Sequence, residues 1–186
     1  MKCHVYLLLE MRKTLYVIGF IVFCLLGFLL IGVFKPMISY DLTIRINRPI
    51  AKCWTVYQTD SLKYRWMPGY KRTILMKGDS ITNGTQQQII FESDQSEVAM
   101  FQTIDSIQNE SFIAYNVVNH AMNIHTKIDF IATEQHASTI HVHNEIRANN
   151  IFLKSLMVFM KSKFESSENS NYQNLKELIE SKQVDN

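Results

Sequence analysis

The chain has 186 residues, with 19 Lys and Arg against 17 Asp and Glu, and 47% of its residues are hydrophobic. The small net charge of +2 argues against a nucleic-acid-binding protein held by bulk charge, and the hydrophobic content argues against a disordered chain. The 3 cysteines, one of them inside an apolar run, cannot form the disulfide framework of a small secreted domain. We therefore expect no nucleic-acid partner.

The most apolar part of the chain is the run from Thr14 to Phe34, which holds 21 consecutive uncharged residues. At about 1.5 Å per residue this run spans about 31 Å, which matches a hydrocarbon core of about 30 Å. It is longer than the apolar run of a cleaved signal peptide, and no nearby segment resembles a partner helix. The sequence predicts a short tail over residues 1–13, a transmembrane helix over 14–35 and one domain over 36–186.

Basic residues flank the predicted anchor on both sides, so their number does not decide its orientation. The adjacent Arg12 and Lys13 and the short tail favour a cytoplasmic N-terminus. We therefore expect a single-pass membrane protein whose domain lies on the non-cytoplasmic side. Met11 is a second suitable start, so the sequence leaves the true start open between Met1 and Met11.

The domain opens with a clear strand signal, followed by signals for two short helices. From Ile38 to Ile46 apolar and polar residues alternate, as in a strand with one buried face. Pro49 suits the first turn of a short amphipathic helix. Asp60 or Ser61 can cap a second short helix, which the Pro68-Gly69 pair ends.

The middle of the domain reads as a series of strands, and its end reads as a helix. The best strands, joined by hairpin-length loops, predict an antiparallel meander from residue 70 to about 148: Thr85–Glu92, Glu97–Ile107, Phe112–Asn119, Ile124–Thr133 and Thr139–Ile146. After Asn150, a suitable N-cap, the apolar spacing becomes helical. We expect one long C-terminal helix, loosened over residues 166–171, where helix propensity is poor.

This order of elements predicts an α+β fold in which a curved antiparallel sheet of about six or seven strands wraps the C-terminal helix. The chain resembles the START-like, or SRPBCC, superfamily, in its branch of polyketide cyclase/dehydrase and lipid-transport proteins. The resemblance covers roughly residues 38–182 and rests on residues 42–54, residues 60–69, which end in Trp-Met-Pro-Gly, and the helix end over 164–179. It implies a helix-grip fold with an apolar cavity, where family members bind hydrophobic small molecules and a minority perform chemistry.

Periodicity predicts which residues line such a cavity. They lie on the apolar faces of two adjacent strands and on the helix opposite: Ile124, Thr126, Ile128, Phe130, Ile140, Val142, Asn144, Ile146, Phe152, Leu156, Phe159 and Met160. The alternative is that these side chains fill a solid core. The polar residues that we nominate for acid–base chemistry are few: Asn144, Tyr115, Asn116 and His120.

No pattern matches a nucleophile elbow, a phosphate loop, a zinc-protease helix or a dinucleotide-binding turn. His125, His141 and His143 alternate onto the face opposite the apolar one, so we expect a solvated patch, with no metal and no cofactor. The expected function is membrane-anchored binding or transport of a hydrophobic, lipid-like small molecule. The alternatives are a cyclase- or hydrolase-like enzyme of the same superfamily and a non-catalytic interaction module.

Charge is unevenly distributed along the domain. Residues 45–77 hold eight basic side chains and one acidic one, whereas residues 78–134 hold one basic and eight acidic ones. The basic part follows the anchor in sequence, so we expect Arg65, Lys71 and Arg72 to face anionic headgroups of the bilayer. The alternative is an ordinary solvated surface.

Overall fold

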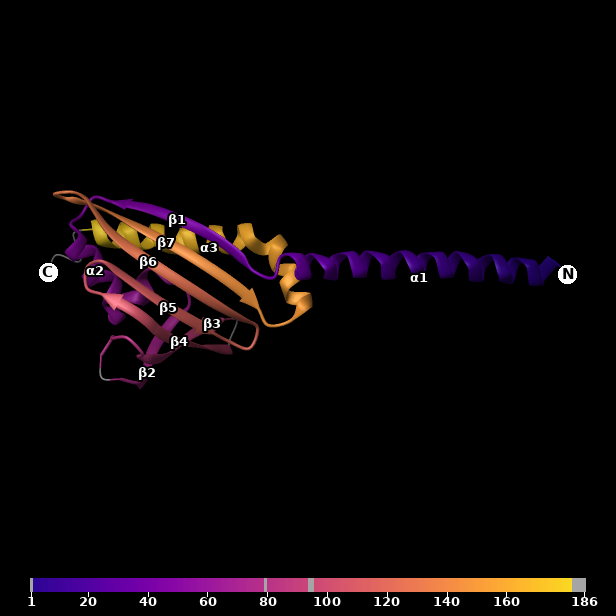
Figure 1. Ribbon diagram of the computed structural model, residues 1–186, viewed down its shortest axis with the longest axis horizontal. Helices are drawn as coiled ribbons and strands as arrows, with labels where there is room; N and C mark the ends of the chain where they lie inside the picture. The colour runs from indigo at the N-terminus through magenta and orange to yellow at the C-terminus, as the bar shows by residue number, and fades with distance from the viewer. Residues whose placement is uncertain (1, 79, 94–95, 182–186) are drawn as a thin grey trace.

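The computed structural model describes residues 2–78, 80–93 and 96–181; Met1 and residues 182–186 of the predicted tail and domain lie outside the described residues. A long N-terminal helix projects from a domain in which a curved sheet wraps a second long helix (Figure 1). The predicted helix-grip architecture, with an apolar helix at its N-terminus, is confirmed.

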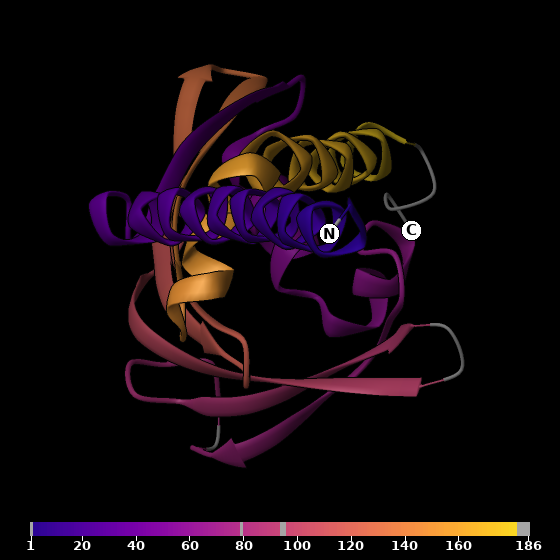
Figure 2. The same cartoon turned by 90° about the vertical axis from the view of Figure 1, so that its right-hand side faces the viewer.

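The sheet has seven antiparallel strands in the order β1-β7-β6-β5-β4-β3-β2. The strands β2 to β7 follow one another as a meander, and the last of them, β7, pairs with β1, from Ile38 opposite Ile146 to Ile46 opposite Ser138. Figure 2 shows the sheet curving around the C-terminal helix. The strands are β1 (Ile38–Ile46), β2 (Tyr70–Lys77), β3 (Gln86–Ser93), β4 (Ser96–Gln108), β5 (Phe112–Val118), β6 (Met122–Glu134) and β7 (Ala137–Ala148).

Two short helices separate β1 from β2, as predicted: α2 (Ile50–Gln58) and the 3-10 helix η1 (Asp60–Arg65). The turn that follows them requires glycine at position 69. Gly69 has a φ of 76°, and a Cβ there would lie 2.8 Å from the carbonyl oxygen of Glu92. The Gly69 carbonyl in turn accepts from the Glu92 amide at 2.7 Å, so this turn fixes the start of β2 against β3.

The C-terminal helix, α3 (Ile151–Glu180), begins at the predicted cap, because the Asn150 side chain accepts a hydrogen bond from the Leu153 amide at 2.9 Å. The expected loosening over residues 166–171 is absent, and that segment is helical throughout. Tertiary contacts override its poor propensity, since Glu168 bonds to the sheet and Tyr172 is buried.

The core lies between the concave face of the sheet and the helices α2 and α3. Every second residue of β1 is buried, which is the predicted alternation. Aromatic rings join α2 to the sheet, since the Trp54 ring lies 5.1 Å from that of Phe130. Rings also join η1 to α3, since Trp66 lies 6.1 Å from Tyr172.

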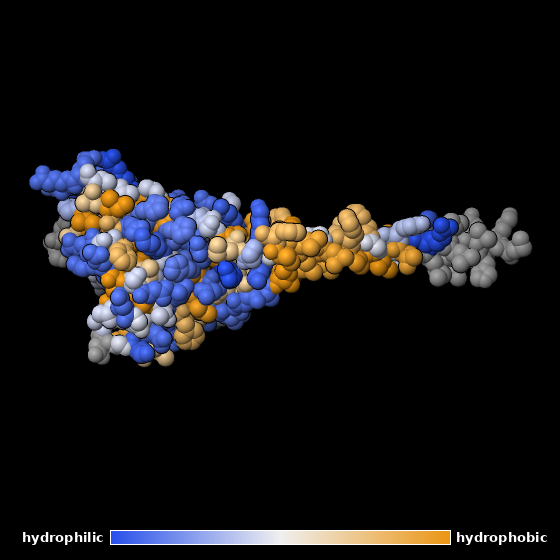
Figure 3. Space-filling view, in the orientation of Figure 1, coloured by the Kyte–Doolittle hydropathy of each residue, from blue (hydrophilic) through white to orange (hydrophobic). Residues whose placement is uncertain are grey.

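The N-terminal helix, α1 (Lys2–Phe34), starts within the predicted tail, and it is apolar and exposed along most of the length whose side chains are described. Figure 3 shows its apolar surface extending away from the mixed surface of the domain. Residues Arg12–Phe34 are long and apolar enough to cross a membrane, a property that a signal sequence shares.

The end of α1 packs on the first half of α3, which is a partner helix that the sequence did not reveal. The ring of Phe28 lies 5.4 Å from that of Phe152 and 6.2 Å from that of Phe159. The Gly32 amide donates to the Ser155 hydroxyl at 3.1 Å, and both residues are buried. A Cβ on Gly32 would lie 2.6 Å from that hydroxyl oxygen, so the absence of a side chain permits this close approach.

Candidate functional site

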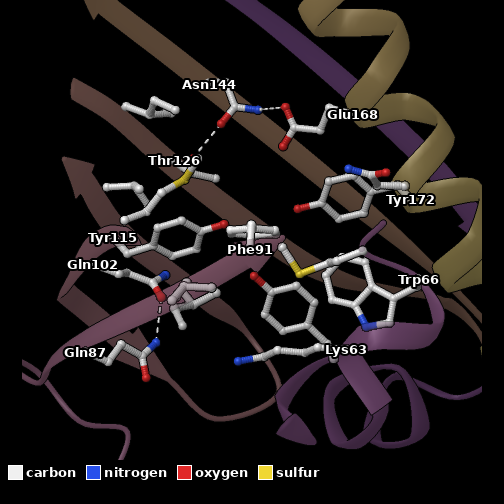
Figure 4. A pocket seen from close by; sticks show the side chains of 18 of the residues that line it. Lys63, Trp66, Gln87, Phe91, Gln102, Tyr115, Thr126, Asn144, Glu168 and Tyr172 are labelled. Atoms are coloured by element: carbon white, nitrogen blue, oxygen red, sulfur yellow. Dashed lines mark hydrogen bonds between the residues drawn. The ribbon is translucent and has the colours of Figure 1, made fainter. Parts of the chain in front are cut away.

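A cavity of about 270 Å³ lies between the concave face of the sheet and the second half of α3 (Figure 4). Its volume is close to the roughly 300 Å³ at which small-molecule pockets begin, and it is far more than a packing defect. The strands β3 to β7 form its floor, and α2 and η1 contribute residues to one side.

Most of the cavity wall is apolar. Aliphatic, thioether and phenyl side chains from five strands, the loops and α3 line it: Met67, Ile81, Ile89, Phe91, Met100, Ile104, Ile113, Val117, Ile124, Ile146 and Phe164. Such side chains adapt to irregular shapes and need no hydrogen bonds. A molecule in this space would therefore be held chiefly by burial of its own apolar surface.

Four polar side chains form a connected cluster on one side of the cavity. The Glu168 carboxylate oxygen Oε2 accepts from the Tyr40 hydroxyl and from the Asn144 amide nitrogen, each at 2.6 Å. The Asn144 amide oxygen accepts in turn from the Thr126 hydroxyl at 2.6 Å. Figure 4 shows Asn144 between Thr126 and Glu168, with a hydrogen bond on each side. The cluster links β1, β6 and β7 to α3.

Burial shifts the proton affinity of this cluster. It raises the pKa of Glu168 above its ordinary value, although the hydrogen bonds from Tyr40 and Asn144 act in the opposite direction. Burial also raises the pKa of Tyr40, and the adjacent Glu168 carboxylate adds to this rise. Tyr115, which lines the same cavity, has its pKa raised to about 12, mainly by burial. The cluster thus offers a carboxyl group with an increased tendency to hold its proton.

Two further sets of polar groups line the cavity. The buried Gln87 and Gln102 side chains, from β3 and β4, are hydrogen-bonded to each other. Lys63 extends from η1, and its ammonium lies 3.0 Å from the Asp60 carboxylate. That carboxylate also accepts from the Tyr70 hydroxyl at 2.7 Å, so Lys63 is held beside a fixed negative charge.

Four of the predicted lining residues lie in the cavity wall, namely Ile124, Thr126, Asn144 and Ile146. The other eight lie elsewhere. On the sheet, the concave face is correct but the position along it differs, because α2 and the core cover these side chains: Ile128, Phe130, Ile140 and Val142. On α3, the residues lie in the half that contacts α1, before the cavity begins: Phe152, Leu156, Phe159 and Met160.

Of the four polar residues nominated for acid–base chemistry, two line the cavity and two lie outside it. Asn144 and Tyr115 line the cavity. Asn116 points away from it and donates to Asp105 at 2.8 Å, and His120 is exposed in a loop. Glu168 was missed, although its spacing carried a signal. It occupies the buried stripe of α3 together with Phe164, Tyr172, Leu175 and Ile179, where a charged residue is unexpected.

The three histidines lie on the outer face of the sheet beside carboxylates. His143 Nδ1 lies 2.8 Å from an Asp41 oxygen, and this hydrogen bond raises the pKa of His143. His141 lies 3.8 Å from the same oxygen, and His125 lies 3.5 Å from Asp105. Among the described residues, no group of three or more His, Cys, Asp or Glu side chains is arranged to hold a metal ion.

The three residues of the predicted basic patch lie on different elements, and Arg65 lies far from the end of the anchor. Lys71 and Arg72, at the start of β2, pair with Glu97 at 3.1 and 3.2 Å. Arg65 lines a depression with Asn174, 19 residues along α3 from the anchor contact at Ser155, which corresponds to about 29 Å of helix. These positions and the acidic partners of Lys71 and Arg72 favour the alternative of a solvated polar surface.

Comparison with known proteins shows the fold alone. No protein-family model and no curated protein sequence matches the chain. Among solved structures, Ara h 8.0201 superposes with a TM-score of 0.62 at 15% identity, covering 77% of this chain and 97% of that one. Norcoclaurine synthase from Thalictrum flavum, in complex with dopamine and hydroxybenzaldehyde, gives 0.56 at 14% identity, covering 77% and 86%. Protein CV1439 from Chromobacterium violaceum gives 0.59 at 11% identity, covering 77% and 97%. The domain therefore has the helix-grip fold of these structures.

Proposed function

We propose that this protein is a membrane-anchored binding protein for a hydrophobic small molecule, which occupies the cavity between the sheet and α3. The observation that carries this proposal is the cavity of about 270 Å³ with largely apolar walls and a polar cluster around Glu168. The fold neighbours support it, because one of them was solved with small organic molecules bound. Affinity would come from the apolar walls, and orientation from the few polar groups.

The anchor part of the proposal rests on α1. Its apolar surface is exposed along the described length, whereas the core helix of a globular domain would be buried. Its end contacts α3 at Gly32 and Ser155, which supports a helix that is retained with the domain over a leader that is removed. The mass of the mature protein tests this point, since a retained anchor keeps residues 14–34 and a cleaved signal sequence loses them.

The binding function is tested by filling the cavity. Val117 lines it from β5, while the next residue, Val118, is 42% exposed on the other face of the same strand. Full-length protein is purified in lipid nanodiscs, and bound molecules are extracted and identified by mass spectrometry. We expect Val117→Trp to lower the bound amount about fivefold or more, because overpacking costs about 1–3 kcal/mol.

Val118→Trp is the matched control, and it should retain the bound molecule. Equal occupancy in wild type and in Val117→Trp would overturn the proposal. Absence of any extracted molecule from the wild-type protein, with empty nanodiscs as the blank, would also count against it.

Glu168 favours a second candidate function, which is acid catalysis in the same cavity. A buried carboxyl group with a raised pKa, aimed at an apolar cavity, has the properties of a general acid. In an enzyme, Glu168→Gln would trap unreacted substrate, so the molecules extracted from the variant and from the wild type would differ in mass. In a carrier the two masses are the same.

A further inference from the structure

Two buried hydrogen-bond donors in the cavity wall lack a partner. Among the described residues, the buried side-chain nitrogen and oxygen atoms without a hydrogen bond are Gln58 Nε2 and Trp66 Nε1. Both residues line the cavity, and Trp66 is only 5% exposed. Buried polar groups are almost always hydrogen-bonded, so two unpaired donors at one cavity indicate that something else supplies the acceptor.

The two donors and a third, Lys63, come from the same segment of the chain and line the same cavity. Gln58 is the last residue of α2, Trp66 directly follows η1, and Lys63 lies between them on η1. Figure 4 shows Lys63 and Trp66 on the side of the cavity opposite Asn144 and Glu168. An ammonium group has three hydrogens, of which the Asp60 carboxylate takes one at 3.0 Å.

The charge balance of this side favours an uncharged acceptor over an anion. The positive charge of Lys63 is already offset by Asp60, which is itself held by Tyr70. A carboxylate bound here would therefore be an uncompensated buried charge, which is unfavourable. A carbonyl oxygen has two lone pairs and no charge, so it can accept from two of these donors at no such cost.

We infer that Gln58, Lys63 and Trp66 form a donor site for a carbonyl oxygen, such as a ketone or ester, on the hydrophobic molecule that the cavity binds. This inference rests on the proposed function and specifies the ligand class. The apolar body of the ligand contacts the strands, and its carbonyl end is held by α2 and η1. The site recognises the ligand by pairing donors that have no hydrogen-bond partner within the described part of the protein.

Two probes of nearly equal shape test this donor site, namely 2-acetylnaphthalene, which carries a ketone oxygen, and 2-ethylnaphthalene, which does not. Full-length protein in nanodiscs is dialysed against each probe, with empty nanodiscs as the blank for partitioning into lipid. We expect the ketone to bind about tenfold more tightly, because it satisfies donors that the hydrocarbon leaves buried and unpaired.

The two tryptophans of the chain provide a site-specific readout. Trp54 packs on Phe130 in the core, so Trp54→Phe leaves Trp66 as the only indole. In the NMR spectrum, a hydrogen bond from Nε1 to the ketone should move the indole N–H proton of Trp66 to higher chemical shift than 2-ethylnaphthalene does. This measurement keeps the cavity donors intact and does not depend on the folding of a donor variant.

Removal of the donors should remove the preference for the ketone. We expect Gln58→Leu and Trp66→Phe each to reduce the ratio of ketone affinity to hydrocarbon affinity several-fold. Trp54→Phe keeps all three donors, so it is the matched control and should keep that ratio. Equal affinity for both probes, with the same indole N–H chemical shift in both complexes, would overturn the donor site and leave the cavity function standing. Binding of neither probe would overturn the proposed function and the donor site together.

Discussion

Glu168 is the residue on which the polar chemistry of the cavity centres. One of its oxygens receives hydrogen bonds from both Tyr40 and Asn144, so the side chain is fixed between α3 and two strands. A carboxyl group in this position is costly to ionise, because burial raises its pKa. Its presence on the buried stripe of α3 therefore points to a role in ligand recognition or chemistry.

The raised pKa predicts a pH-dependent effect of Glu168→Gln on stability. A carboxyl whose folded pKa exceeds its unfolded value favours the folded state below the unfolded pKa, and this contribution is lost as the pH rises through the folded pKa. Glutamine does not ionise, and its amide oxygen can accept the same two hydrogen bonds. We expect the free energy of unfolding of Glu168→Gln, relative to wild type, to increase from pH 4 to pH 8.

This increase in the relative free energy of unfolding amounts to about 1.4 kcal/mol for each unit by which the folded pKa of Glu168 exceeds its unfolded pKa. Denaturant unfolding at several pH values measures it. Glu177→Gln, at an exposed position of the same helix, accounts for the general effect of removing one carboxylate from α3. A difference between Glu168→Gln and wild type that does not change with pH would contradict the assignment.

His143 gives a second test at the scale of single residues. Its hydrogen bond to Asp41 is the main cause that raises the pKa of His143, because the carboxylate stabilises the imidazolium form. We expect Asp41→Asn to lower this pKa toward its ordinary value, as measured by NMR titration of the imidazole signals. Asp105→Asn, which alters the surroundings of His125 instead, should leave the His143 titration unchanged.

At the scale of elements, periodicity predicted the strands and helices because one face of each is buried. The alternation from Ile38 to Ile46 and the cap at Asn150 are both present in the structure. The same periodicity could not locate the cavity along the sheet. Ile128 and Ile124 share a face of β6, yet only Ile124 lines the cavity, since the space depends on where α2 and α3 cross the sheet.

The packing of α1 on α3 was also beyond periodicity, because Gly32 and Ser155 are 123 residues apart in sequence. Small residues reveal a helix contact only when the partner is known. Likewise, Glu168 and Tyr40 each occupied a buried stripe of the pattern, but their pairing depends on the register of β1 against α3. The pattern placed both residues on buried faces, but neither was among the predicted polar site residues, and the sequence could not show that their side chains meet.

The close approach of the two helices makes Gly32 a critical position. Gly32→Leu would place a side chain against the Ser155 hydroxyl and the Ile151 carbonyl, which lie 2.6 and 2.7 Å from the Cβ position. We expect α1 to separate from α3. If the substitution removes about 1 kcal/mol of helix packing, the ratio of molecules with α1 packed on α3 to molecules with α1 separated falls about fivefold.

Disulfide cross-linking between Phe28→Cys and Phe152→Cys, whose native rings lie 5.4 Å apart, measures this separation. The matched control is Gly27→Leu, because a Cβ at Gly27 meets nothing within 4 Å. If Gly32→Leu cross-links as efficiently as Gly27→Leu, the contact does not hold the two helices together.

On the scale of the whole molecule, the cavity lies at a distance from the anchor. The anchor contacts α3 at Ser155, and the cavity contacts it from Phe164 to Tyr172, which corresponds to about 14–26 Å along the helix. A membrane-anchored domain would thus hold the cavity near the lipid surface but outside the hydrocarbon core. A ligand taken from the bilayer would need to leave the membrane to enter it.

The chain offers a test of whether it spans a membrane and on which side the domain lies. Cys3 and the exposed position His136 lie on opposite sides of the apolar segment in sequence, while Cys24 lies within it and Cys53 is buried. Because the Arg12-Lys13 pair favours a cytoplasmic N-terminus, we expect His136→Cys to react with a membrane-impermeant maleimide in right-side-out vesicles. Cys3 should react only after permeabilisation.

Reaction of Cys3 alone would reverse the orientation. Reaction of both residues before permeabilisation would exclude a span, and loss of Cys3 from a protein of reduced mass would identify a signal sequence.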